Sequence, residues 1–205
     1  MINILGKCAL FLLAVYFLST APVFADSTTT FTFTGTVGNI GTTSTFTAGS
    51  LSLIATGYSA PGITVDMFAK SDATQMGLGL VNDIFSENEI SGGHFIQLNL
   101  SNILAASPSS IAISMQSVTG ADRYAIWGSN AAGMMGTLLA TDLTAASFTL
   151  PDLGMFQYIS ISAPAGNVLL HDVDVSTPEP GSASLLLLGF IALVGAGTLG
   201  KKLVA

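Results

Sequence analysis

The stretch Phe156-Gln-Tyr-Ile-Ser-Ile-Ser-Ala-Pro-Ala-Gly-Asn-Val-Leu-Leu-His-Asp-Val-Asp-Val175 carries the clearest structural signal in the chain. Apolar and polar residues alternate on both sides of a short break, as they do in strands that bury one face. The break, Pro164-Ala-Gly-Asn167, consists of residues that favour turns. The stretch therefore predicts two strands joined as a β-hairpin.

The same period of two recurs along the rest of the chain. The runs are bounded by clusters of glycine, proline, asparagine, aspartate or serine, and no amphipathic helix longer than two turns is evident. About nine short strands without helical crossovers favour an antiparallel β-sandwich, jelly-roll-like in its winding, over a small closed barrel. The other predicted strands are Thr30–Val37, Leu51–Thr56, Ile63–Phe68, Phe95–Leu100, Ile111–Met115, Tyr124–Trp127 and Ala146–Leu150.

Residues 1–25 have the three parts of a secretory signal peptide. Lys7 supplies positive charge, Cys8–Leu18 is an apolar segment too short to span a membrane, and Ala25 ends a small-x-small cleavage site before Asp26. Cleavage there removes the one cysteine of the chain. Because export leads to an oxidising compartment, a mature chain without disulfides must rely on a packed core for its stability.

The last thirty residues, 176–205, place three physical features in a fixed order. Pro178-Glu179-Pro180 is stiff and extended, because each proline fixes its own φ and disfavours helix at the residue before it. The run from Ala183 to Leu199 has no charge and approaches the roughly 20 residues that cross a bilayer. Lys201 and Lys202 follow, and positive charge is retained on the inner side of a membrane. A transmembrane helix with a stiff external approach is predicted.

This C-terminal segment resembles the PEP-CTERM sorting signal of exported proteins in exopolysaccharide-producing Gram-negative bacteria. The matching parts are Pro178, Glu179 and Pro180, the apolar run, and the basic pair Lys201 and Lys202, where the usual pattern has an arginine cluster. The resemblance implies recognition by exosortase, a transpeptidase-like membrane protease, and cleavage near the Pro-Glu-Pro. The alternative is an ordinary C-terminal anchor that begins with the same residues.

The two ends divide the chain into three expected parts. These are a signal peptide (1–25), a β-sandwich exported domain (26–176) and a sorting signal (177–205). The resemblance implies export by the Sec route, a transient inner-membrane intermediate, and release to the cell surface or the extracellular matrix. A plain inner-membrane-anchored periplasmic protein, which keeps its tail, is the competing expectation.

The middle of the chain is also similar to the body of many PEP-CTERM proteins. The shared pattern is a Gly-Leu-Gly turn at Gly77–Leu80, an acidic step at Asn88–Ile90, a long strand over His94–Leu100 and an aromatic strand at Arg123–Gly128. This second resemblance implies only a β-rich exported domain, and it assigns no functional residue.

Charge in the exported domain is scarce and one-sided. Residues 26–176 hold eleven acidic residues against two basic ones, Lys70 and Arg123, which gives a net charge of −9 with neutral histidines. Affinity for phosphates depends on lysine and arginine, so this composition repels nucleic acid and anionic lipid. Nucleic acid is therefore excluded as an expected partner.

The residues that carry common enzyme chemistry are thinly represented. The sequence has no Gly-x-Ser-x-Gly elbow, no metalloprotease helix and no phosphate-binding loop. His94 and His171 lie in predicted strands, and His171 alternates with Leu169 and Val173, so we expect ordinary edge or core histidines. The chain is predicted not to be an enzyme. A secreted hydrolase acting on matrix polysaccharide, with either histidine beside an acid, is the alternative.

Two acidic groups are candidates for a structural calcium ion, because calcium is bound by six to eight oxygen ligands. Asp172 and Asp174 are two residues apart in a strand, so they share a face and repel each other unless they are solvated or bridged by a cation. The alternative is a solvated acidic rim. The first candidate group consists of Asp83, Glu87 and Glu89, and the second consists of Asp172 and Asp174.

Tyr124 and Trp127 are candidates for contact with a glycan. Their odd spacing places them on opposite faces of a regular strand, while Tyr124 and Ile126 share one face. Burial in the core is the favoured interpretation for these aromatic residues. We expect a structural or adhesive role in exopolysaccharide or biofilm, with exosortase and possible matrix glycans as the partners and no cofactor beyond the calcium considered above.

Overall fold

Alternating burial along the strands builds one hydrophobic core between two β-sheets. The computed structural model describes residues 26–33, 37–72, 74–81 and 83–178, and residues 26–178 form one compact unit. In β10 (Ser110–Gln116), for example, Ile111, Ile113 and Met115 are buried and the residues between them are not. Burial of such side chains favours folding by about 25 cal/mol per Å² of apolar surface. The predicted all-β sandwich is confirmed.

Sheet A holds eight strands of the described chain, in the order β13-β10-β15-β7-β6-β2, with β1 and β8 also paired with β15. Its neighbouring strands are antiparallel. The bounds of the other seven strands are β1 Asp26–Thr32, β2 Gly38–Gly41, β6 Met67–Ser71, β7 Met76–Leu80, β8 Ile90–Ser91, β13 Ser147–Thr149 and β15 Asn167–Pro178.

Sheet B holds seven strands of the described chain, in the order β12-β11-β14-β9-β4-β3, with β5 paired with β4. These pairings are antiparallel as well. A single helical turn, α2 (Ser101–Ala105), follows β9. The strand bounds are β3 Thr43–Ala48, β4 Leu51–Ala60, β5 Ile63–Thr64, β9 Phe95–Asn99, β11 Arg123–Ser129, β12 Thr137–Leu143 and β14 Tyr158–Ala165.

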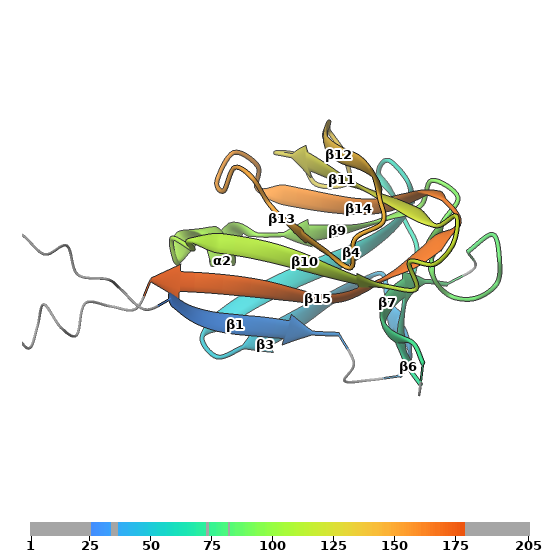
Figure 1. Cartoon of the computed structure of the whole chain (residues 1–205), viewed down its shortest axis with the longest axis horizontal. Coiled ribbons are helices and arrows are strands. Elements are labelled where there is room, and N and C mark those ends of the chain that lie inside the picture. The colour runs from blue at the N-terminus through green and yellow to red at the C-terminus, as the bar shows by residue number, and fades with distance from the viewer. Residues whose placement is uncertain (1–25, 34–36, 73, 82, 179–205) are drawn as a thin grey trace, which may run out of the picture. The chain divides into compact units, whose positions relative to one another are not determined.

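The first and last strands of the described chain pair with each other in sheet A. β15 pairs with β10 along one side and with β1 and β7 along the other, and its first two residues pair with β8. Asp26 lies opposite Pro178, and the register continues to Thr32 opposite Asp172. Figure 1 shows β1 and β15 side by side, with the start of β1 next to the end of β15. Sheet A therefore depends on residues from both ends of the domain.

Eight of the nine predicted strands each overlap one strand of the described chain, but the predicted hairpin is wrong. β14 pairs with β9 and β11 in sheet B, while β15 pairs in sheet A, so the chain crosses from one sheet to the other at Gly166. Gly166 has a φ of +67°, and a side chain there would clash with the carboxylate of Asp122. The chain does break between two strands near the predicted turn, at Gly166, but long-range pairing gives each strand its neighbours.

Two further local expectations are corrected. The predicted strand Ile63–Phe68 is split between β5 in sheet B and β6 in sheet A. The expected Gly-Leu-Gly turn at Gly77–Leu80 is part of strand β7. Side chains at Gly77 and Gly79 would clash with the backbone of β15 and of Asn88, respectively. These glycines therefore allow close backbone approach rather than a turn.

His171 does not share a face with both Leu169 and Val173, because a β-bulge interrupts the alternation. Ser114 pairs with Asp172 and the next residue, Met115, pairs with Leu170, so His171 is the extra residue on β15. The bulge places Leu170 and Val173 in the same core although they are three residues apart. Beyond it, Asp172 alternates with buried Val173, and Asp174 with buried Val175.

Candidate functional site

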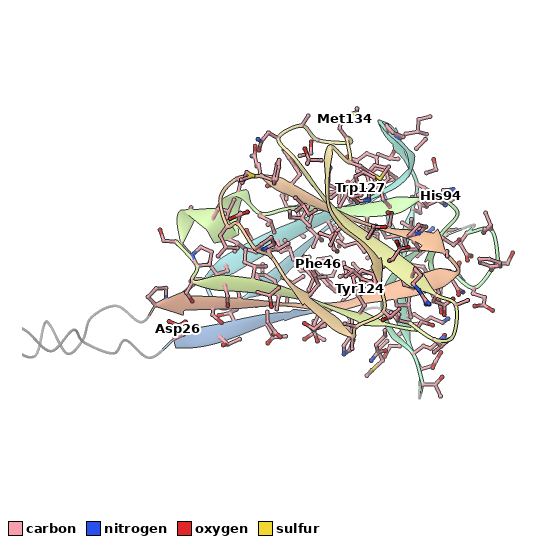
Figure 2. All side chains as sticks on the ribbon, turned by 45° about the horizontal axis from the view of Figure 1, so that its top comes forward. Asp26, Phe46, His94, Tyr124, Trp127 and Met134 are labelled. Carbon is pink, nitrogen blue, oxygen red and sulfur yellow. The ribbon has the colours of Figure 1, made fainter. Side chains whose placement is uncertain are left out.

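The predicted processing points meet at one end of sheet A. Asp26 and Pro178 are register partners, and the hydroxyl of Ser109 donates to Oδ2 of Asp26 at 2.6 Å. The amide of Ser109 also donates to the carbonyl of Ser176 at 2.8 Å. Figure 2 shows Asp26 at this end of the molecule. The boundary residues are thus held together by pairing and by Ser109.

Several predicted site residues lie outside the described part of the chain. They are Ala25, Glu179, Pro180, Lys201 and Lys202, together with the signal peptide 1–25 and the predicted transmembrane run. Within residues 26–33, 37–72, 74–81 and 83–178, no helix is long and apolar enough to cross a membrane.

The first acidic group is tied into the fold by its hydrogen bonds. Asp83 is buried, and its carboxylate accepts from the backbone amide of Asn88 at 2.9 Å. Glu89 is fully buried, and its Oε1 lies 3.0 Å from Nζ of Lys70. Glu87 is exposed and accepts from the side-chain amide of Asn167 at 2.6 Å. The three acids therefore have separate partners.

The buried carboxylate of Glu89 also accepts a hydrogen bond at 3.2 Å from the hydroxyl of Ser117. Its second oxygen, Oε2, is buried and finds no hydrogen-bond partner among the described residues. Lys70 further donates to the carbonyl of Glu87 at 3.2 Å. This ion pair fastens the segment around Glu89 to β6, since burying a carboxylate is costly unless it is paired.

The second acidic group lies on the outer face of sheet A. Oδ1 of Asp174 accepts from the hydroxyl of Thr30 at 2.5 Å, and Oδ2 of Asp172 lies 3.6 Å from Nε2 of His171. In the described ranges no three His, Cys, Asp or Glu side chains come together in a geometry that suits a metal. Calcium binding at either acidic group remains a prediction.

The two histidines belong to different parts of the fold, and His94 lies just before β9 rather than inside a strand as predicted. His171 lies at the bulge of β15 and pairs with its chain neighbour Asp172. His94 precedes β9 in sheet B, and its backbone amide donates to the carbonyl of Ser91 at 3.0 Å. The Nδ1 atoms of both rings are buried and lack hydrogen-bond partners within the described residues. Among the described residues, His171 has a carboxylate beside it, whereas His94 forms no ion pair with an acid.

Tyr124 is a core residue. Its side chain is fully buried, and its hydroxyl donates to the carbonyl of Ala145 at 2.8 Å. Burial raises the pKa of this phenol. Tyr124 shares the core with Ile126, as the alternation predicted. Because it offers no surface to a sugar, the suggested glycan contact at Tyr124 is corrected to a packing role.

Trp127 lies on the opposite, outer face of β11 and is half-buried. Its indole Nε1 donates to the hydroxyl of Ser162 at 3.0 Å, and Leu138 of β12 lies opposite it in the register. Leu138 is 44% exposed. Figure 2 shows Trp127 on the same side of the molecule as Met134 and His94. Trp127 thus remains a candidate for glycan contact.

The outer face of sheet B contains aromatic and amide residues that the sequence analysis did not select. The rings of Tyr58 and Phe95 stack with their centroids 4.9 Å apart. Gln97 accepts from the amide of Gly133 at 2.7 Å and donates to the carbonyl of Met134 at 2.9 Å. Gln97 therefore pins the segment that includes Gly133 and Met134 onto this face. The polar side chain of Gln97 between the apolar residues Ile96 and Leu98 was the signal in the sequence.

The phenol of Tyr58 lies in a group of hydroxyls on the same face. Its pKa is raised by burial and by the neighbouring phenol of Tyr158, while a hydrogen bond with Thr56 acts in the opposite direction. Thr56 also lies 3.2 Å from the hydroxyl oxygen of Thr43. Strands β3, β4 and β14 thus bring their hydroxyl groups close together.

No protein-family model matches the chain, and neither the curated proteins nor the solved structures that were compared include one similar to it.

Proposed function

We propose that this chain is an exported protein, processed at both ends, with a structural or adhesive role at the cell surface or in an extracellular polysaccharide matrix. Residues 1–25 act as a Sec signal peptide that is cleaved before Asp26, and residues 177–205 act as a sorting signal recognised by an exosortase-like membrane protease. The chain passes through an inner-membrane intermediate in a Gram-negative bacterium. The domain performs no catalysis, and its sandwich is wound as a jelly roll.

The observation that carries this proposal is the agreement between the predicted processing points and the limits of the folded unit. The compact unit begins at Asp26 and ends at Pro178, and these two residues are partners in one register. A cut on the C-terminal side of Pro178 leaves every described pairing of β15 intact. Removal of both terminal segments is therefore compatible with the complete core.

The jelly-roll winding is supported by how the later strands alternate between sheets. β10, β13 and β15 belong to sheet A, whereas β9, the hairpin β11–β12 and β14 belong to sheet B. In each sheet the late strand, β15 or β14, inserts beside a strand formed much earlier in the chain. This order suits a sandwich whose chain wraps around the core.

Fractionation of cells with an exosortase tests the sorting step. We expect the unaltered protein at the cell surface or in the medium, and we expect replacement of Pro178, Glu179 and Pro180 by alanine to retain it in the membrane fraction. The matched control replaces Pro151 and Asp152, an exposed proline–acid pair in a loop, by alanine and leaves sorting unchanged. Unaltered protein that stays in the membrane would support a simple anchor instead.

A further inference from the structure

Four strands that lie next to one another in sheet B contain no charged residue, and neither does the two-residue strand β5. The four strands are β3, β4, β9 and β14, with the sequences TSTFTA, LSLIATGYSA, FIQLN and YISISAPA. Residues 26–178 nevertheless hold eleven acidic and two basic residues. The charges are therefore concentrated elsewhere, on loops, on sheet A and on the two remaining long strands of sheet B.

The register of these four strands arranges their outward residues into a continuous surface. Thr45 lies opposite Ile54, Ile54 opposite Asn99, and Asn99 opposite Tyr158. Neighbouring positions on β3 and β4 add two more pairs of outward residues. We call this surface the neutral face, and it consists of Thr43, Thr45, Thr47, Ser52, Ile54, Thr56, Asn99 and Tyr158.

The neutral face is accessible. The three threonines of β3 are exposed, and Ile54 is 37% exposed, while Asn99 and Tyr158 are half-buried. Side chains on one face of a strand repeat about every 6.7 Å, and neighbouring strands lie about 4.8 Å apart. The surface thus presents hydroxyls, an amide, an aromatic ring and an aliphatic side chain on a regular grid.

This chemistry suits an uncharged sugar polymer. Threonine and serine hydroxyls both donate and accept hydrogen bonds, as sugar hydroxyls do. The side-chain oxygen of Asn99 already accepts from the amide and the hydroxyl of Ser101, so its NH2 group is the part that offers donors to a ligand. An aromatic ring and an aliphatic side chain provide apolar contact for the carbon-bearing face of a sugar ring. We infer that the neutral face binds a neutral polysaccharide. This inference deepens the proposed matrix role and rests on it for its biological setting.

One border of the neutral face is rigid. Gln97 holds the segment with Gly133 and Met134 through two hydrogen bonds, and the amide of Gly62 donates to the carbonyl of Gly133 at 2.9 Å. Beneath this segment, the ring of Tyr58 stacks on Phe95. A surface that is already ordered loses less conformational entropy when it binds a ligand.

The negative charge of sheet A and of the whole domain favours a neutral polymer over an acidic one. The outer face of sheet A carries Asp172 and Asp174 beside the threonines of β1. The domain as a whole is strongly acidic, so long-range repulsion disfavours a polyanion, and the neutral face provides no cation to offset it. Selection for uncharged chains follows from both features.

Retention on insoluble polysaccharides tests the inference with the full exported chain. The probes are cellulose, starch and a β-1,3-glucan as neutral polymers, and cross-linked alginate as a polyanion. We expect retention on at least one neutral polymer and none on alginate. Ile54→Lys, which places a charge in the centre of the neutral face, should weaken retention at least tenfold. Asn99→Ala and Tyr158→Ala should each weaken it severalfold.

The matched control is Thr149→Lys, which places the same charge at an exposed position on β13 of sheet A. It should retain binding within about twofold, and thermal melts should show that each variant is folded. Three results overturn the inference: no retention of the unaltered chain on any neutral polymer, unchanged retention of Ile54→Lys, or a dimer that Ile54→Lys dissociates while polysaccharide retention is absent. None of these results depends on how the chain ends are processed, so the sorting proposal is judged separately.

Discussion

The two sheets share one core but differ in the faces that they turn away from it. Sheet A joins the first and last strands of the domain, and its outer face carries aspartates, threonines and a histidine at a bulge. The outer face of sheet B is uncharged over four strands. Sheet A therefore joins the two ends of the domain, while sheet B presents a broad uncharged surface to solvent. If sheet B binds polysaccharide as we propose, closure and recognition lie on opposite sides of the same sandwich.

The largest effect should follow from removal of β15. A chain that stops after Gly166 lacks the strand that pairs with β1, β7, β8 and β10, so we expect loss of cooperative unfolding. Circular dichroism during heating measures this loss. The control chain stops after Pro178, keeps every described pairing of β15 and should unfold cooperatively. A cooperative transition without β15 would show that sheet A does not close the domain.

Two aromatic residues on β11 compare the core with the outer face of sheet B. Tyr124→Ala removes a fully buried ring and should lower the free energy of unfolding by about 3–5 kcal/mol. Trp127→Ala removes a half-buried ring and should lower it by about 1–2 kcal/mol. Urea denaturation measures both changes. Equal losses would contradict the assignment of the two rings to opposite faces.

The buried ion pair provides a test on the side of sheet A. Lys70→Met leaves the carboxylate of Glu89 buried without its cation, which should lower the free energy of unfolding by about 3 kcal/mol. The double variant Lys70→Met with Glu89→Leu removes both charges and should recover most of that loss. If the double variant is as unstable as the single one, the two side chains stabilise the fold through packing rather than through their charges.

The smallest effect concerns pH. Hydrogen bonds from the backbone and hydroxyl of Thr74 and from the backbone of Gln75 lower the pKa of Asp72 below 3.8. A lowered pKa stabilises the fold at pH values above the ordinary value, and this contribution is lost as pH falls through the folded value. Asp72→Asn should therefore flatten the decline of Tm below about pH 4 slightly. An unchanged pH profile would contradict this role.

Local alternation predicted the strands well because it reflects burial of one face, and this feature survives in the folded chain. It placed Tyr124 with Ile126 in the core and Asp172 with Asp174 outside it. It missed β7, since the glycines of Gly77–Leu80 suggested a turn when they in fact allow close backbone packing. It also missed β3, whose threonines and serine resemble a polar loop.

Pairing partners could not be predicted in the same way. The turn between β14 and β15 suits a hairpin as well as a crossing between sheets, and only distant strands such as β9 and β1 decide between them. The bulge at His171 likewise depends on the register with β10. The neutral face went unrecognised for the same reason, since it joins residues from strands that lie far apart in the sequence.

The most direct test of the proposed export and processing is the intact mass of the mature protein recovered from its native cells, with both terminal peptides sequenced. We expect a chain that begins at Asp26 and ends between Pro178 and Gly181, free or carrying an added group. A mature chain that retains Leu185–Ala205 would contradict it and would identify the C-terminal segment as a permanent anchor.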